Sequence, residues 1–278
     1  MSFNLIVVKF RKMLFILNSK ISSAGSILFF SAFSFYSCSS GNGNDSKIKF
    51  NASLLPSAAN CDQVVTHKAF TLCYSEKDEE PRWVAYLLTK EMCETNVVKR
   101  KDKFIPDPLV KTGSAESSDY KSSGFDRGHL CPAGDMNWSE QTMEESFYMS
   151  NMSPQVHGFN AGIWEKLEGR VRKWASQKNE VLVICGGVLR EGLQKIGVKN
   201  KISVPEYFYK IIYTESGGAS AIGFIIPNQV CTGKSYIDFS VSVDSVEKFT
   251  GIDFFPALPD TSETRIEKNF NRSSWLNK

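Results

Sequence analysis

Residues 124–135 have the sequence GFDRGHLCPAGD, and they constrain the architecture and chemistry of the chain more than any other segment. An acid, a guanidinium and an imidazole stand within four residues, at Asp126, Arg127 and His129. Arginine suits the binding of phosphate oxygens, because its planar guanidinium presents several donors in a fixed fork. Histidine can take a proton near neutral pH, because its unperturbed pKa is about 6.5. Taken alone, the segment fits equally well a loop in which His129 only makes hydrogen bonds.

A second informative segment is FNAGIWEKLE, residues 159–168. Asn160 stands where a helix is predicted to begin, and its side-chain carbonyl is a hard oxygen ligand suited to magnesium. Asparagine is also a preferred helix N-cap, so both interpretations of Asn160 stay open. Glu168 follows eight residues later, roughly 12 Å along a regular helix. Glu168 would therefore act on the same ion through a bound water, or Asn160 would lie just before the helix.

Together the two segments resemble the DNA/RNA non-specific endonuclease family, which includes Serratia nuclease and endonuclease G. The shared pattern is Asp-Arg-Gly-His-Leu-x-Pro-Ala, followed about 30 residues later by Asn-x-x-x-Trp-x-x-x-Glu. The resemblance covers roughly residues 61–258. It implies an α+β, ββα-metal fold with a mixed or antiparallel sheet core. In that fold the histidine lies on a β-hairpin that packs against the helix carrying the metal-binding asparagine.

The resemblance also implies a role for each site residue. His129 is the implied general base, Asn160 the ligand of a Mg²⁺ ion, and Arg127 a contact to phosphate. Glu168 is the implied outer acid that holds a metal-bound water, and Asn151 an implied polar contact in the active site. Mn²⁺ is the expected substitute for Mg²⁺.

Other polar residues have weaker signals. Some members of the family bind phosphate with a further arginine upstream, and Arg100 is the candidate. Its assignment stays open, because the spacing around Phe104 and Asp107 does not align. His67 and His157 are expected to be structural, since neither stands at a metal-ligand spacing from His129. Of the two, His157 is the better candidate for a functional role, because it lies between the two motif segments.

The predicted function is metal-dependent hydrolysis of phosphodiester bonds in DNA and RNA. No residue of the motif is expected to read a base edge, so we expect recognition of the nucleic-acid backbone with little sequence specificity. One alternative is a phosphodiesterase acting on smaller nucleotides on the same scaffold. Another is a surface lipoprotein that binds nucleic acid or a partner without cutting. The sequence also allows a homodimer.

The N-terminal region differs from the rest of the chain. Residues 1–37 contain four basic residues, no acidic residue and an apolar run over 27–35. This order predicts an export signal, and the run is too short for a membrane-spanning helix. We therefore expect export from a bacterial cell, to the periplasm, to the outer membrane as a lipoprotein, or into the medium. Cys38 is the candidate for lipid attachment, and residues 38–60 are predicted to be a flexible tether.

Charge and cysteine content add two constraints. The chain has 33 basic and 30 acidic residues, and without residues 1–37 it keeps 29 basic residues, a net charge of −1. Net charge therefore gives no support for nucleic-acid binding, and any basic surface must be local. Of seven cysteines, six remain if Cys38 is lipidated, an even number that suits an oxidising compartment. Their connectivity is open, and no CxxC pair predicts a structural zinc site.

The hydrophobic pattern of residues 61–278 predicts one α+β domain, because strands and helices do not alternate regularly. Predicted strands cover 83–89, 181–185, 207–213 and 221–226. The best predicted helix runs from 161 to about 178, with shorter ones over 141–149 and 242–249. The long helix is predicted by an apolar stripe at spacings of four, four and three residues, formed by Ile163, Leu167, Val171 and Trp174.

Overall fold

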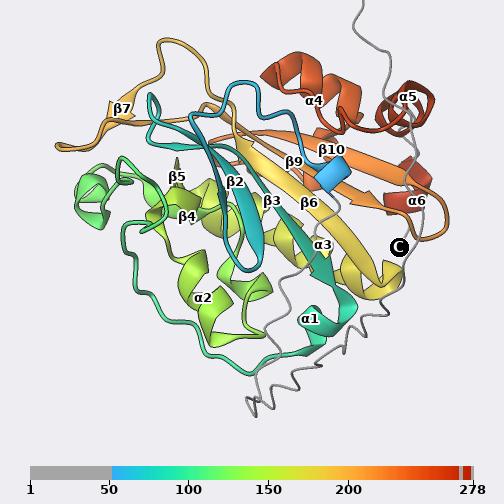
Figure 1. Cartoon of the computed structure of the whole chain (residues 1–278), viewed down its shortest axis with the longest axis horizontal. Helices are drawn as coiled ribbons and strands as arrows, with labels where there is room; N and C mark the ends of the chain where they lie inside the picture. The colour runs from blue at the N-terminus through green and yellow to red at the C-terminus, as the bar shows by residue number, and fades with distance from the viewer. Residues whose placement is uncertain (1–51, 269–271, 277–278) are drawn as a thin grey trace, which may run out of the picture. The chain divides into compact units, whose positions relative to one another are not determined.

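A seven-stranded sheet forms the centre of the protein, in a computed structural model that describes residues 52–268 and 272–276. All neighbouring strands run antiparallel, as Figure 1 shows for the central ones. The α+β fold with an antiparallel sheet core is thereby confirmed. In spatial order, the strands are β1 (Gln63–Thr66), β2 (Phe70–Ser75), β3 (Glu80–Thr89), β6 (Glu180–Gly187), β9 (Tyr207–Thr214), β10 (Ser220–Pro227) and β11 (Ser240–Val241).

Helices cover both faces of this sheet (Figure 1). Side chains alternate between the faces along a strand. Val84 and Tyr86 of β3 therefore share one core with helix α3 (Glu165–Lys178). Trp83 points the opposite way and shares a second core with helices α4 (Val243–Thr250) and α5 (Asp260–Lys268). Because the central strands are buried on both faces, their sequences are nearly continuous apolar runs.

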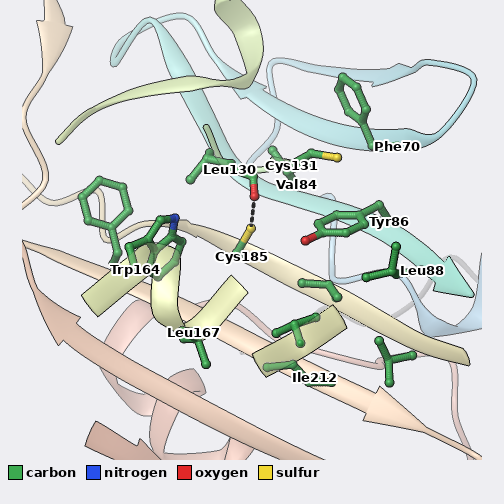
Figure 2. Close-up of a cluster of buried hydrophobic side chains, with 14 of the residues drawn as sticks. Phe70, Val84, Tyr86, Leu88, Leu130, Cys131, Trp164, Leu167, Cys185 and Ile212 are labelled. Atoms are coloured by element: carbon green, nitrogen blue, oxygen red, sulfur yellow. Dashed lines mark hydrogen bonds between the residues drawn. The ribbon is translucent and has the colours of Figure 1, made fainter. Parts of the chain in front are cut away.

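A separate two-stranded hairpin carries the first motif. Strand β4 (Asp126–His129) pairs antiparallel with β5 (Met152–Gln155), so that residue 126 faces residue 155 and residue 129 faces residue 152. A Cβ at Gly128 would lie 2.1 Å from the side chain of Gln155, so a larger residue here would have to displace this buried side chain. Figure 2 shows how the hairpin is joined to the sheet: the Cys185 thiol of β6 donates to the carbonyl of Leu130 at 3.2 Å.

The helix that follows the hairpin begins irregularly. Residues Phe159–Trp164 form a π-helical segment, and regular α3 starts only at Glu165. The predicted apolar stripe is confirmed, because its four residues are all buried in the core or against it. The π-helical start was not predicted, since hydrophobic periodicity does not resolve one extra residue in a turn. Such segments are frequent at functional sites.

The end of α4 and the smaller elements complete the description of the domain. Gly251 adopts a left-handed conformation, with φ of 72°, directly after α4, which confirms the predicted end of that helix. No helix in the described ranges is long and apolar enough to cross a membrane. The remaining elements are α1 (Lys90–Glu94), α2 (Glu140–Ser146), α6 (Arg272–Leu276), β7 (Lys195–Ile196), β8 (Ile202–Ser203) and five 3-10 turns, at Ala52–Leu54, Ser117–Tyr120, Ala133–Asp135, Met149–Asn151 and Tyr236–Phe239.

The N-terminal part of the domain differs from the prediction of a tether over 38–60. The backbone N–H of Ser57 donates to the carbonyl of Asp253 at 2.8 Å, and the Trp83 indole donates to the carbonyl of Ser57 at 3.2 Å. Leu54 and Leu55 pack against the core beside α4, so residues 52–60 belong to the folded domain. The burial of these two apolar side chains outweighs the loop-like composition of the Asn, Ser and Pro residues around them. The predicted signal over 1–37 and Cys38 lie outside the described residues.

The cysteines form fewer bonds than an oxidised set of six would. Cys61 and Cys73 are joined by a disulfide between the start of the domain and β2. The other four cysteines of the described ranges are free thiols, and two of them are fully buried in the core. Buried apolar cysteines behave as small hydrophobic residues, which explains their place beside the hairpin. The four are Cys93, Cys131, Cys185 and Cys231.

Candidate active site

Four of the predicted site residues line one pocket of about 300 Å³. Strand β4 contributes Arg127 and His129, the π-helical segment contributes Asn160, and α3 contributes Glu168. The hairpin and the helix therefore bring together residues that are up to 41 positions apart in the sequence. This is the juxtaposition that the two motif segments predict.

A larger groove of about 870 Å³ adjoins this pocket. The two share Arg100, Arg127 and Asn160 in their walls. The groove adds Lys103 and Lys121 as basic side chains, and it includes aromatic residues. Basic and aromatic side chains together suit a nucleic-acid strand, whose phosphates and bases they can contact. The local basic surface that net charge does not indicate is therefore present beside the site.

His129 is almost completely buried, with 9% of its surface exposed. The ring of Phe147 meets it edge-on at 4.9 Å, and the ring of Phe104 lies 5.7 Å away. Burial, together with the nearby Arg100 and Arg127 and against an opposing effect of Asp102, lowers the pKa of His129 to about 3. The imidazole is therefore neutral at pH 7, which is the form that can accept a proton.

We expect the imidazole of His129 to stay neutral in the folded, metal-free protein from pH 8 down to about pH 4. The depressed pKa means that the folded state binds fewer protons than the unfolded state below about pH 6.5. This group therefore removes stability as the pH falls from there toward 3. Histidine NMR titration measures this directly, with His129→Gln to assign the resonance. A His129 signal with a midpoint near pH 6.5 would contradict the expectation.

Two arginines flank the histidine. The guanidinium of Arg127 lies 4.1 Å from the ring centroid of Phe104 and donates to the hydroxyl of Ser117. The guanidinium of Arg100 lies over Phe147 at 5.2 Å, and its Nε donates to Asp102 at 2.7 Å. Arg100 thus lines the same pocket as Arg127, although the spacing around it left its assignment open. Phe147 and Phe104, which pack against Arg100 and Arg127, are the residues that could have indicated a shared position for the two arginines.

Asn160 is oriented by a residue to which the motif assigned no role. Its side-chain Nδ2 donates to the Asp126 carboxylate at 2.8 Å, and the His157 ring contacts the same carboxylate oxygen at 2.9 Å. This bond fixes which way the amide points and leaves the carbonyl Oδ1 free for another partner. Asn160 lies inside the π-helical segment, whose N-cap is Gly158, so the N-cap interpretation is wrong. An oriented amide oxygen in a pocket with a carboxylate fits a hard divalent cation.

Glu168 lies at the edge of a buried charged network. Burial raises the pKa of Glu168 to about 7. Lys210 has the next largest effect and lowers this pKa. The smaller effects come from Asp135, which raises it, and Arg172, which lowers it. Asp135 and Arg172 pair directly at 2.7 Å, and the Tyr86 hydroxyl donates to Asp135 at 3.0 Å. Glu168 and Asn160 line the same pocket, and the π-helical turn over residues 159–164 lies between regular α3 and the hairpin.

Asn151 does not face the pocket, which corrects the expected active-site contact. The residue is fully buried. Its Oδ1 accepts from the backbone N–H of Cys131 at 2.9 Å, and its Nδ2 donates to the carbonyls of Cys131 and Ser146, each at 2.8 Å. These bonds hold the segment directly after His129. The physical reason is that the Asn151 side chain is saturated by backbone groups.

His67, expected to be structural, lies outside both cavities. It is buried, and its Nε2 pairs with Asp107 at 2.9 Å. The Ser150 hydroxyl donates to the same carboxylate, next to Asn151. The pair therefore stabilises the segment that precedes β5.

Comparison with known proteins identifies relatives of this architecture. The family described as DNA/RNA non-specific endonuclease matches residues 55–261. The mitochondrial nuclease EXOG of Danio rerio is 36% identical over 203 residues, which are 67% of this chain and 59% of the relative. The mitochondrial nuclease of Saccharomyces cerevisiae is 30% identical over 73% of this chain and 68% of the relative. A chain in the crystal structure of the EndoG/EndoGI complex superposes with a TM-score of 0.68 at 32% identity, covering 75% of this chain and 91% of that one. This chain thus spans less than two thirds of the length of the EXOG relatives.

These relatives correct the expected localisation. Export from a bacterial cell was predicted, whereas the relatives from animals and yeast are named as mitochondrial nucleases, so that prediction is wrong. The composition of residues 1–37 could not distinguish an export signal from a transit peptide, because transit peptides of organelles also contain basic residues and few acidic ones.

The fold and the matched residues agree on the family to which the chain belongs. The chain belongs to the DNA/RNA non-specific endonuclease family.

Proposed function

We propose that the protein is a divalent-metal-dependent nuclease that hydrolyses phosphodiester bonds in DNA and RNA with little sequence specificity. The observation that carries this proposal is the single pocket lined by Arg127, His129, Asn160 and Glu168. It contains a neutral base, a fixed guanidinium and two oxygen-bearing side chains, which are the groups that phosphodiester hydrolysis needs.

His129 is the proposed general base. Its Nε2 is buried without a hydrogen-bond partner among the described residues, so we assign the acceptance of a proton from the attacking water to Nδ1. Arg127 and Arg100 would bind the nonbridging phosphate oxygens and add fixed positive charge where negative charge develops. The same two cations add to the effect of burial in lowering the pKa of His129, so one pair of side chains would serve both substrate and base.

Mg²⁺, with Mn²⁺ as a substitute, is the proposed metal. Asn160 Oδ1 would bind the ion directly, and Glu168 would hold it through a water. When bound, the ion supplies a Lewis acid for the phosphate and the leaving oxygen. Among the described residues, no group of three or more His, Cys, Asp or Glu side chains could enclose a metal. The proposed donor set of one amide oxygen and one carboxylate fits Mg²⁺, which keeps several waters and takes few protein ligands.

The adjoining groove supports a polymeric substrate over a small nucleotide. Lys103 and Lys121 are placed to contact phosphates beyond the scissile one, and Phe125 offers a ring on which a base can stack. Contacts of this type read the backbone and the base faces, and they give little sequence preference.

The test is a digestion assay on the purified full chain. We expect cleavage of supercoiled plasmid and of RNA with Mg²⁺, and loss of cleavage with EDTA that added Mg²⁺ or Mn²⁺ restores. Bis-p-nitrophenyl phosphate should be a far poorer substrate, because this small diester is too short to contact the groove while its phosphate lies in the pocket. Preferential hydrolysis of the small diester would favour the smaller-nucleotide alternative. Binding of nucleic acid without cleavage under every metal condition would refute the proposal.

A further inference from the structure

A further cavity, of about 350 Å³, lies beside the helix that carries Asn160. We call it the lysine cavity, because Lys166 of α3 and Lys234 of the loop after β10 both line it. Gly162 of the π-helical segment and the half-buried Tyr236 also form part of its wall. Among the described residues, no carboxylate lines it. The cavity therefore combines positive charge, accessible backbone and an aromatic ring, and it shares no lining residue with the pocket or the groove.

The lysine cavity and the active-site pocket occupy adjoining faces of one helix. Glu165 lines the pocket, whereas its neighbour Lys166 lines the cavity. Consecutive residues of a helix differ by about 100° around its axis, and a helix with its side chains is roughly 10–12 Å across. One strand of a nucleic acid carries a charge about every 3.4 Å along its axis. A strand that leaves the pocket across this helix would therefore bring to the cavity a phosphate that lies a few positions from the scissile one.

The loop that carries Lys234 is fixed relative to the pocket. The Asn228 side chain donates through Nδ2 to the carbonyls of Pro154 and Pro205, at 3.0 Å and 2.9 Å. Its Oδ1 accepts from the backbone N–H of Val156 at 2.8 Å. These bonds join the start of the loop to the end of β5 and to the segment that enters the π-helical turn. The fold therefore sets the distance between the cavity and the pocket.

The two ammonium groups of the lysine cavity have no protein partner among the described residues. Neither the Lys166 nor the Lys234 side chain makes a hydrogen bond, ion pair or ring contact there. Other exposed lysines are paired, as Lys248 is with Asp244 at 2.8 Å. A Cβ at Gly162 would meet no atom within 4 Å, so the backbone leaves open space for an approaching anion. Two unpaired cations in a cavity without carboxylates suit phosphate groups.

We propose that the lysine cavity is a second phosphate-binding subsite, which holds the nucleic-acid strand through Lys166 and Lys234 a few nucleotides from the scissile bond. The groove with Lys103 and Lys121 extends from the hairpin side of the pocket, and the lysine cavity extends from its helix side. The strand would therefore be held on both sides of the pocket. This rests on the proposed function, because the ligand is the same strand that the active site would cleave.

Removal of the two charges should lower both the affinity for the strand and its dependence on salt. Each phosphate contact to a single strand contributes about 0.7 to the slope of log Kd against log salt concentration. Lys166→Gln/Lys234→Gln should therefore lower this slope by about 1.4 and raise Kd about tenfold at roughly 0.1 M KCl. Fluorescence anisotropy measures both quantities without cleavage, using the full-length chain in EDTA and a labelled DNA strand of about 20 nucleotides. In Mg²⁺, the loss should appear in KM for that strand more than in kcat.

Lys111→Gln/Lys173→Gln is the matched control. Both lysines are exposed, with Lys173 on α3, and neither lines the pocket, the groove or the lysine cavity. The control variant loses the same net charge and should keep the wild-type salt slope. Equal losses of slope in the two double variants would show a general effect of net charge and would overturn the proposal.

Cys231 is a direct probe of what occupies the cavity, because its free thiol lies in the cavity wall. In EDTA, a saturating concentration of the DNA strand should slow alkylation of Cys231 by N-ethylmaleimide several-fold. The rate at Cys93, whose thiol lines none of the three cavities, should not change. Peptide mass spectrometry measures both rates. Equal protection of Cys231 by thymidine monophosphate would assign the cavity to a small nucleotide and refute the strand subsite.

The subsite and the proposed function fail in different ways. A wild-type chain that binds the strand but does not cleave it with Mg²⁺ or Mn²⁺ would refute the proposed function. Unprotected Cys231, together with a wild-type salt slope in Lys166→Gln/Lys234→Gln, would refute the subsite even in an active nuclease.

Discussion

His129→Ala should lower the rate of plasmid cleavage about 10³-fold, because a general base contributes on the order of 10² to 10⁴ in rate. The side chain lies in the pocket with Asn160 and Glu168, and its pKa keeps it unprotonated at neutral pH. In the variant, the attacking water loses its proton acceptor, while the two arginines remain. The loss should therefore appear in kcat more than in KM. Initial nicking rates at saturating Mg²⁺ measure it.

The variant must be shown to fold, because His129 is buried between aromatic rings. Near-ultraviolet circular dichroism and thermal melting provide that check. A more specific control is the addition of free imidazole, which can enter the space left by the side chain and should restore part of the activity of His129→Ala. Full activity of the folded variant without imidazole would rule out His129 as the base.

Trp174→Ala should reduce the free energy of unfolding by about 3 to 5 kcal/mol, the usual cost of removing a large buried ring. Trp174 is 1% exposed, stacks on Phe224 at 6.3 Å between ring centroids, and donates its indole N–H to the carbonyl of Trp275 at 2.8 Å. The substitution therefore opens a cavity between α3 and the sheet and removes a hydrogen bond to α6. Urea unfolding at pH 7, with the Cys61–Cys73 disulfide intact, gives the value.

Trp174→Phe is the matched control, because it keeps most of the apolar volume and loses only the indole donor. It should cost clearly less than Trp174→Ala, on the order of 1 to 2 kcal/mol. Equal costs for the two variants would mean that the hydrogen bond to Trp275, and not the packing, dominates. A cost below 1 kcal/mol for Trp174→Ala would contradict the assignment of this ring to the main core.

Much of the fold is predictable from the sequence where one physical signal dominates. The runs that became β3, β6, β9 and β10 are apolar on both faces, because each lies between two layers of helices. The apolar stripe of α3 and the glycine after α4 were equally clear. That Arg127, His129, Asn160 and Glu168 line one pocket was predictable, because the hairpin and the helix that carry them are close in sequence and pack together.

Other features depend on contacts that the sequence does not encode locally. The pairing of Asn151 with the backbone of Cys131 requires knowledge of the loop after His129. The place of Arg100 depends on Phe147, which is 47 residues away. The localisation could not be derived, because basic residues and an absence of acids are common to several targeting signals.

The π-helical turn over Phe159–Trp164 makes the site sensitive to chain length as well as to side chains. A turn of this kind holds one residue more than a regular α-helical turn. Removal of one residue from it would let α3 continue regularly toward its N-terminus, and Asn160 would rotate by about 100° around the axis. Its amide would then leave both Asp126 and the pocket, although every functional side chain would still be present. The geometry of the candidate site thus depends partly on the number of residues in this turn, so we expect deletion of one residue here to be more damaging than many substitutions.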